Sequence, residues 1–343
     1  MSGLRTYRNY SLSETPSLEG QVAVVTGGQE GIGKEITAQL LLHGIDQVII
    51  VARNEDNFKS AYDDWRVRKG TNLTEGDNRV VFMKCDLGDM KNVAATAERI
   101  KQRADQIHIL ICNAGLGVQP IEPLNDDGID PIFAVNCIGH QMLTTLLLPN
   151  IKRATATAPH GARIIFTSSS MHQFCRTLDL ADLTRPSGIY PHLADCVWRY
   201  GRSKVGNTLF AKELNRRLLL DAAENDDPAA RDIYVNSYFP GIVVTRQWQG
   251  WSEHMGDLVG KVMRFLARFG GQSDEDGAAS AIYLAASPKV KELDSRGLYY
   301  IPIATVDEPT ALAQDEKLAT RLWDWIDDRV AQKLGPDWKT VQW

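Results

Sequence analysis

The sequence predicts a single α/β domain of Rossmann type, with a doubly wound parallel sheet and helices on both faces. Apolar runs of four to seven residues alternate with helical segments from residue 20 onward, a pattern typical of a parallel sheet covered on both sides. The first run leads through a glycine-rich turn into a helix, as in a dinucleotide-binding βαβ unit. No shift in composition along the 343 residues marks a second domain.

The expected elements follow from hydrophobic periodicity. The predicted strands are Gln21–Val25, Gln47–Ala52, Arg79–Lys84, Ile107–Asn113, Arg163–Ser168, Asp232–Tyr238 and Leu298–Ile301. The predicted helices are Ile32–Leu42, Asn57–Lys69, Lys91–Arg103, Ile129–Leu147, Val197–Leu220 and Gly277–Ala286. The acidic stretch Asp221–Asp232 predicts a solvated loop. We expect residues 1–19 to form a polar arm, residues 20–305 the catalytic domain and residues 306–343 a helical extension.

Composition excludes several classes of function. The net charge of −5 argues against a nucleic-acid partner, since a phosphate-binding face needs a basic surplus. The five cysteines are odd in number and contain no CxxC pair, and the histidines form no ligand set, so neither a disulfide framework nor a metal site is expected. We expect no signal peptide, because the N-terminal residues contain no long apolar stretch, and no run of about 18 apolar residues occurs in the sequence. We expect a cytoplasmic protein without a membrane span.

The turn after the first strand is the first candidate binding site. Its candidate residues are Gly27, Gln29 and Gly31, followed by Ile32 and Gly33 at the start of the helix. Glycines let the backbone approach a pyrophosphate, and the helix N-terminus offers unpaired N–H groups to it. The alternative is a tight turn without a ligand, which the strand before it and the helix after it disfavour.

Arg53 favours NADP(H) over NAD(H). It follows the second strand, where an acidic residue would accept from the ribose 2′-hydroxyl and an arginine accommodates a 2′-phosphate. The alternative is an ordinary solvated arginine. Glu30 complicates the prediction, because a carboxylate pointing at a 2′-phosphate would repel it; it could instead pair with a base or face solvent.

Seven short motifs now occur in a fixed order. They are Thr26-Gly27-x-x-x-Gly31-Ile32-Gly33, Asp86-Leu87, Asn113-Ala114-Gly115, Asn136, Ser168-Ser169-Ser170, Tyr200-x-x-x-Lys204 and Pro240-Gly241-Ile242-Val243-Val244-Thr245. Over residues 20–305 this series resembles the classical short-chain dehydrogenases/reductases. The segment Ala52-Arg53-Asn54 and the insertion after the serines look like the retinol dehydrogenase and WW-domain oxidoreductase branch, and the C-terminal tail is similar to fungal members.

The resemblance implies roles for individual residues. Ser169, Tyr200, Lys204 and Asn136 would be catalytic, with Ser170 as the alternative to Ser169. Cofactor contacts would come from residues of the remaining motifs, namely Gly27, Gln29, Gly31, Ile32, Gly33, Arg53, Asp86, Leu87, Asn113, Ala114, Gly115, Tyr200, Lys204, Val243 and Thr245. In the family, the residue matching Asn136 holds a water that links the lysine to solvent. Members commonly form dimers or tetramers, so the resemblance leaves a homo-oligomer open.

These residue types suit carbonyl reduction. Hydride transfer to a ketone leaves an alkoxide that needs a proton, and a tyrosine can supply it if a nearby cation lowers its pKa. Lys204 lies four residues after Tyr200 on a predicted helix, so both share one face. Ser169 can hydrogen-bond the substrate oxygen. Singly, each residue has an ordinary structural explanation.

Two segments are expected to shape the substrate pocket. The first is His172–Arg199, with Tyr190 and Trp198. We interpret His172 itself as a loop residue; the alternative is that it lines the pocket. The second is 246–271, the variable lid in the family, whose residues 258–269 carry an amphipathic pattern. That pattern fits a lid, a packed surface helix or a membrane-facing helix. We expect a hydrophobic substrate, such as a polyketide-like secondary metabolite or a retinoid- or steroid-like compound.

The sequence therefore predicts an NADP(H)-dependent oxidoreductase that interconverts a carbonyl and an alcohol. Two alternatives remain: a cofactor-retaining variant that catalyses a non-redox step, and an NADP(H)-binding redox sensor without turnover.

Overall fold

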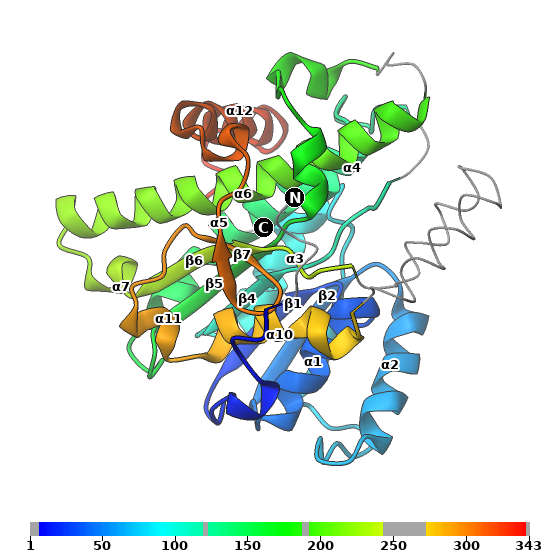
Figure 1. Cartoon of the computed structure of the whole chain (residues 1–343), viewed down its shortest axis with the longest axis vertical. Coiled ribbons are helices and arrows are strands. Elements are labelled where there is room, and N and C mark those ends of the chain that lie inside the picture. Colours follow the sequence, from blue (N-terminus) through cyan, green and yellow to red (C-terminus); the bar gives the residue numbers. More distant parts are fainter. Residues whose placement is uncertain (1–6, 119–122, 187–191, 243–271, 341–343) are drawn as a thin grey trace.

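The computed structural model describes residues 7–118, 123–186, 192–242 and 272–340. One eight-stranded sheet forms its centre, in the order β3-β2-β1-β4-β5-β6-β7-β8 (Figure 1). The strands are β1 (Val22–Thr26), β2 (Gln47–Ala52), β3 (Val80–Lys84), β4 (Ile109–Cys112), β5 (Ala162–Thr167), β6 (Ile233–Tyr238), β7 (Tyr299–Ile301) and β8 (Thr305–Asp307). All pairings are parallel except the antiparallel pair β7–β8. The predicted Rossmann-type fold is confirmed.

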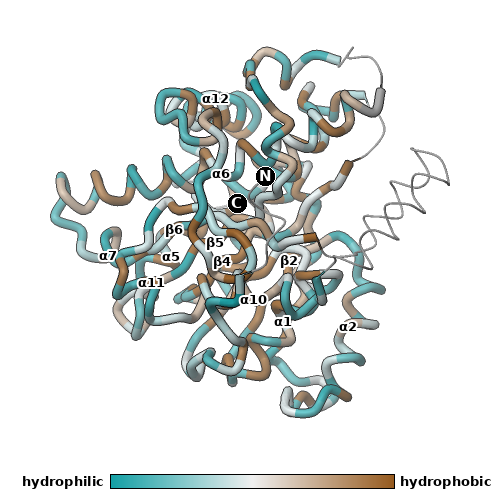
Figure 2. Tube along the Cα trace, viewed as in Figure 1, coloured by the Kyte–Doolittle hydropathy of each residue, from teal (hydrophilic) through white to brown (hydrophobic). Residues whose placement is uncertain are grey.

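Helices cover both faces of the sheet. The helices α1 (Gly31–Leu42), α2 (Glu55–Val67) and α10 (Asp274–Ala286) contribute to one hydrophobic core. The opposite core contains α3 (Met90–Arg103), α5 (Gly139–Ala154), α6 (His192–Glu224) and α12 (Glu316–Leu334). Figure 2 shows apolar residues gathered along the inner strands. Because strands β1, β2, β4 and β5 are buried on both faces, their apolar runs are continuous rather than alternating.

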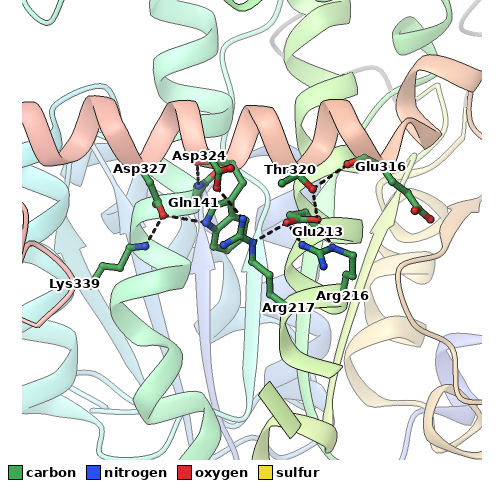
Figure 3. Close-up of polar contacts among 10 residues, drawn as sticks. Gln141, Glu213, Arg216, Arg217, Glu316, Thr320, Asp324, Asp327 and Lys339 are labelled. Carbon is green, nitrogen blue, oxygen red and sulfur yellow. Dashed lines mark hydrogen bonds and ion pairs between the residues drawn. The ribbon is translucent and has the colours of Figure 1, made fainter. Parts of the chain in front are cut away.

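The C-terminal helix α12 packs along α6, which spans the molecule (Figure 1). Trp323 of α12 stacks on Phe210 of α6, with ring centroids 4.8 Å apart. In the polar contacts of Figure 3, Glu213 of α6 is buried and accepts hydrogen bonds from Arg216, Arg217 and Thr320. Gln141 of α5 donates to the Trp323 carbonyl at 3.4 Å. This part of the surface of α5 and α6 is therefore occupied by the chain's own C-terminal helix.

Among the described helices, only the segment Pro131–Ala154 is long and apolar enough to cross a membrane. However, 78% of its most apolar stretch is buried inside the protein. It begins as α4 (Pro131–Phe133), widens into a π-helical turn over Ala134–Ile138 and continues as α5. Its apolar character is explained by contacts with the core.

Two local predictions were wrong. The stretch Asp221–Asp232 is mostly helical, because α6 continues to Glu224 and a short helix, α7 (Pro228–Arg231), follows. Asp227 begins α7 by accepting hydrogen bonds from the backbone N–H groups of Ala229 and Ala230, so its charge caps a helix. His172 lies in a 3-10 helix, Ser170–Phe174, and is buried. Strand β8 and the short helix α11 (Lys289–Glu292) were not predicted.

Candidate active site

A cavity of about 810 Å³ opens at the carboxyl ends of the strands. It lies where the strand order reverses, between β1 and β4, which is where ligands bind in open α/β sheets. Most of the predicted site residues line it: Gly27, Gln29, Gly31, Ile32, Arg53, Asp86, Leu87, Asn113, Ala114, Gly115, Ser169, Tyr200 and Lys204. The fold thus brings segments from the whole chain into one site.

The glycine-rich turn disfavours side chains at two positions, for lack of space at Gly33 and because of the backbone conformation at Gly27. A Cβ atom on Gly33 would lie 2.2 Å from the carbonyl oxygen of Gly27 and 2.5 Å from the Asn113 amide nitrogen. Gly27 itself has a φ of +64°, which L side chains rarely adopt. The turn ends at the N-terminus of α1, where backbone N–H groups have no partner within the helix. Gln29 also places a buried side-chain oxygen here that has no partner among the described residues.

Thr26 fastens this turn to the end of β4. Its hydroxyl oxygen accepts hydrogen bonds from the backbone N–H groups of Asn113 and Ala114, both at 2.9 Å. It also lies 2.8 Å from Nε2 of His140. Since Nδ1 of His140 lies 2.9 Å from the Asn136 carbonyl, Nδ1 carries the proton and Nε2 accepts from Thr26. Burial lowers the pKa of His140 to about 4, so the ring stays neutral at physiological pH.

The end of β2 contains both a cation and a carboxylate. Arg53 is exposed and lines the cavity, and within the described residues it forms no salt bridge. Glu30 lines the same cavity, and its carboxylate accepts a hydrogen bond from the Asn57 amide at 3.1 Å. Asn57 belongs to α2, so this contact ties Glu30 to that helix. Asp86 accepts from the backbone N–H of Gly88 and stays exposed at the cavity.

The structure separates the roles of Ser168 and Ser169. The Ser168 hydroxyl donates to the Lys204 carbonyl at 3.0 Å and accepts from Thr208, so it fastens β5 to α6. The Ser169 hydroxyl accepts from the backbone N–H of Met171 at 3.2 Å and forms a hydrogen bond with the Tyr200 side chain. Ser169 is thus the serine of the triplet that shares a hydrogen bond with the tyrosine.

Lys204 lies beside Tyr200 on one face of α6. Its Nζ is 5.4 Å from the centroid of the Tyr200 ring and donates to the Thr167 carbonyl at 3.0 Å. Burial lowers the pKa of Lys204 to about 8. Burial also raises the pKa of Tyr200 to about 12, against the smaller lowering effect of the Ser169 hydrogen bond. We expected the lysine to lower the tyrosine pKa; here the lowering effect comes from the Ser169 hydrogen bond instead, and burial outweighs it because burial disfavours the charged form.

Asn136 occupies the π-helical turn and is fully buried. Its amide donates to the Leu116 carbonyl and to the Ser203 hydroxyl, and its oxygen accepts from the Leu116 N–H at 2.8 Å. A Cβ atom on Gly115 would lie 3.1 Å from that oxygen and 3.6 Å from Nζ of Lys204. Asn136 therefore holds the loop after β4 next to the helix that carries Tyr200.

Comparison with known proteins identifies the family of this chain. A family model described as short chain dehydrogenase matches residues 21–176. A short-chain dehydrogenase/reductase of the fungus Armillaria gallica is 32% identical over 318 residues, which is 93% of each chain. The chain belongs to the short-chain dehydrogenase/reductase family.

Two animal relatives of this short-chain dehydrogenase/reductase match over most of its length. The polyprenol dehydrogenase of Mus musculus is 32% identical, over 90% of this chain and 83% of its own. The WW domain-containing oxidoreductase of Gallus gallus is 30% identical, over 93% of this chain and 70% of its own. The resemblance to the WW-domain oxidoreductase branch and to fungal members is therefore confirmed.

Solved structures share the fold of this short-chain dehydrogenase/reductase. The L-sorbose reductase of Gluconobacter frateurii, complexed with NADPH and L-sorbose, has a TM-score of 0.60 at 20% identity and covers 86% of this chain and 99% of its own. The 3-ketoacyl-(acyl-carrier-protein) reductase of Brucella melitensis, complexed with NADH, has a TM-score of 0.59 at 22% identity, over 84% of this chain and 98% of its own. Both nicotinamide cofactors thus occur among the structural neighbours.

Several predicted residues lie outside the described part of the chain. These are Val243 and Thr245, the expected lid 246–271 and Tyr190. Trp198 is described but does not line the cavity; its ring packs against the Arg202 guanidinium, 4.4 Å from the centroid. The insertion contributes Phe174 and Val197 instead. No cluster of potential metal ligands occurs in the described ranges.

The sequence did not predict the groups that support the site residues from behind. His140 and the Thr167 carbonyl both hold residues of the site in place, as described above. Only His140 had a signal in the sequence, because it lies four residues after Asn136 on the same predicted helix. The apolar lining was also missed, since it comes from separate segments: Leu116, Val118, Met171, Phe174, Val197, Phe239 and Ile242.

Proposed function

We propose that this short-chain dehydrogenase/reductase uses NADP(H) to interconvert a carbonyl and an alcohol on a hydrophobic small molecule, with Tyr200 as general acid/base. The observation that carries the proposal is the hydrogen bond between Tyr200 and Ser169 beside a buried Lys204, in the same cavity as the glycine-rich turn. A redox sensor without turnover would need no tyrosine, serine and lysine together at its cofactor.

The residues present fit a dinucleotide. The turn before α1 admits only glycine at position 33 because of the Gly27 carbonyl, and Arg53 offers a cation at the end of β2, suited to a 2′-phosphate. The Glu30 carboxylate lines the same cavity and accepts from the Asn57 amide, so the preference for NADP(H) rests on Arg53. When bound, a nicotinamide cofactor supplies or accepts the hydride.

The protein's own groups handle the proton. A pKa of about 12 keeps Tyr200 protonated at neutral pH, so in the direction of carbonyl reduction it donates its proton to the substrate oxygen. Ser169 donates a hydrogen bond to the same oxygen as negative charge develops there. The charged form of Lys204, present below pH 8, stabilises the tyrosinate that remains.

The lining supports a hydrophobic substrate. Leu116, Met171, Phe174 and Val197 come from three different segments and all border the cavity that Tyr200 also lines. A relative of this chain is a polyprenol dehydrogenase, which by its name acts on a long isoprenoid alcohol. We therefore place the substrate among apolar alcohols and carbonyl compounds, including isoprenoid, retinoid-like and polycyclic ones.

The test is a cofactor-oxidation assay with NADPH and a panel of isoprenoid, retinoid and steroid carbonyl compounds, with L-sorbose as the polar comparison. We expect turnover on apolar members and a loss of roughly 10²–10⁴-fold in kcat for Tyr200→Phe, with NADPH binding retained by fluorescence titration. Absence of turnover on the whole panel would favour the sensor. Equal turnover by Tyr200→Phe would exclude the tyrosine mechanism, and turnover on L-sorbose alone would exclude the apolar substrate.

A further inference from the structure

His172 lies directly behind the candidate active site. It follows Ser169 by three residues, is only 1% exposed and does not line the cavity. Its ring packs edge-on against Tyr299 of β7, with centroids 5.2 Å apart. The ring is thus held between the serine loop and strand β7, outside the described lining of the cavity.

Two hydrogen bonds define the protonation of the His172 ring. Nδ1 lies 2.6 Å from the carbonyl oxygen of Ser169, and since a carbonyl can only accept, Nδ1 carries the proton. Nε2 accepts from the backbone N–H of Thr310 at 3.3 Å, which requires Nε2 to be unprotonated. Both partners therefore demand the same neutral tautomer. Burial lowers the pKa of His172, while the Ser169 carbonyl and Asp307 oppose that shift.

The Ser169 backbone is held on both sides. Its carbonyl accepts from the His172 ring and also from the His172 backbone N–H at 3.1 Å. Its hydroxyl accepts from the Met171 N–H and bonds to Tyr200. Rotation of the Ser169 peptide would displace the hydroxyl, so the His172 ring restricts the direction in which Ser169 points.

Thr310 connects this contact to the C-terminal segment. It begins the 3-10 helix Ala311–Gln314, which contacts α6 and leads into α12. Helix α12 in turn packs on α6 through Trp323 and Phe210. The helix that carries Tyr200 and the loop that carries Ser169 are therefore both in contact with the C-terminal segment.

We propose that His172 is a positioning residue through which the C-terminal segment, from Thr310 onward, sets the orientation of Ser169 toward Tyr200. This inference rests on the proposed function of Ser169 and Tyr200. It assigns the C-terminal segment a part in catalysis, although none of its described residues lines the cavity.

Three substitutions separate the two hydrogen bonds. His172→Phe removes both hydrogen bonds. His172→Asn places an amide near the position of Nδ1 and keeps the hydrogen bond to the Ser169 carbonyl. His172→Gln places its amide near the position of Nε2 and keeps only the hydrogen bond from Thr310. We expect kcat to fall about 10²-fold in His172→Phe, by analogy with small misplacements of a reacting group, and by intermediate factors in the Asn and Gln variants. KM for NADPH should stay unchanged.

His108→Asn is the matched control. His108 is equally buried and also bonds a backbone N–H, that of Val22, but lies at the opposite end of the sheet, before β4. It should lower Tm without changing kcat. A folded His172→Phe variant with wild-type kcat would overturn the proposal, and full activity in His172→Asn would overturn the part assigned to Thr310.

Histidine ¹⁵N NMR tests the contact without any substrate. We expect Nδ1 of His172 to be protonated and Nε2 unprotonated at neutral pH. If this tautomer is found but wild-type protein turns over no carbonyl compound, the proposed function fails while the contact stands. If the opposite tautomer is found, the positioning role fails whatever the activity.

Discussion

The carboxylate of Asp130 lies 3.0 Å from a guanidinium nitrogen of Arg202, and both side chains are almost completely buried. The same carboxylate also accepts from Nε of Arg199 at 2.5 Å and from the backbone N–H of Phe133 at 2.8 Å. Arg199 and Arg202 flank Tyr200 in the sequence, and Phe133 directly precedes the turn that contains Asn136. One buried carboxylate thus joins α6, which carries Tyr200, to the π-helical turn that carries Asn136.

Removal of this carboxylate should destabilise the protein strongly. In Asp130→Ala two buried arginine cations lose their partner, and breaking a buried ion pair costs about 3–5 kcal/mol. The free energy of unfolding from urea titration measures this. Asp221→Ala is the comparison: its partner Lys152 is partly exposed, so we expect about 1 kcal/mol or less. Equal losses in the two variants would refute the argument from burial.

We expect Ser169 to affect kcat and the adjacent Ser168 to affect stability. Ser169→Ala removes the hydroxyl that bonds Tyr200, and loss of one donor to a developing oxyanion costs about 10²–10³-fold in kcat. Ser168→Ala removes a bond between β5 and α6, so we expect a loss of about 1 kcal/mol in stability and a much smaller change in kcat. Steady-state kinetics and thermal unfolding of both variants check this. The reverse pattern would assign catalysis to Ser168.

We expect Lys204 to lower the free energy of unfolding while it supports catalysis. Its pKa falls from 10.5 in the unfolded chain to about 8 in the folded protein, which corresponds to about 3 kcal/mol. Because the pKa is lowered, this cost is fully present below pH 8 and disappears as the pH rises to 10.5. Lys204→Met should therefore be more stable than wild type at pH 7 and lose that advantage by pH 10.5.

The Thr167 carbonyl remains hydrogen-bonded in Lys204→Met, because the Asn207 amide also donates to it at 3.0 Å. Urea titrations at both pH values measure the difference between the two proteins, and kcat at pH 7 should fall. Equal stability at pH 7 would mean that Lys204 carries little desolvation cost.

Arg53 should determine the cofactor. Arg53→Ala removes a cation suited to the 2′-phosphate, and a hydrogen bond to a charged group contributes about 1.5–3 kcal/mol. We expect NADPH affinity to fall roughly 10- to 100-fold, with NADH affinity unchanged. Arg66→Ala on α2, whose partners are Asp63 and Glu75, is the control. Unchanged NADPH preference in Arg53→Ala would contradict our interpretation of this residue.

The sequence by itself determined the alternation of strands and helices and the position of the glycine-rich turn. It also placed Tyr200 and Lys204 on one helix face. These features follow from backbone periodicity and from steric limits that act within a few residues. Because these limits are local, the sequence alone also assigns each motif to its strand, helix or turn.

Only the tertiary structure decided which serine bonds Tyr200, which groups are buried and what holds them. His172 meets Thr310 across 138 residues of sequence, and Asp130 meets Arg199 across 69. Such pairs carry no local pattern, since they form when distant segments pack together. Burial, which raises the pKa of Tyr200 and lowers that of Lys204, is likewise a property of the packed core, because desolvation depends on every neighbour in space.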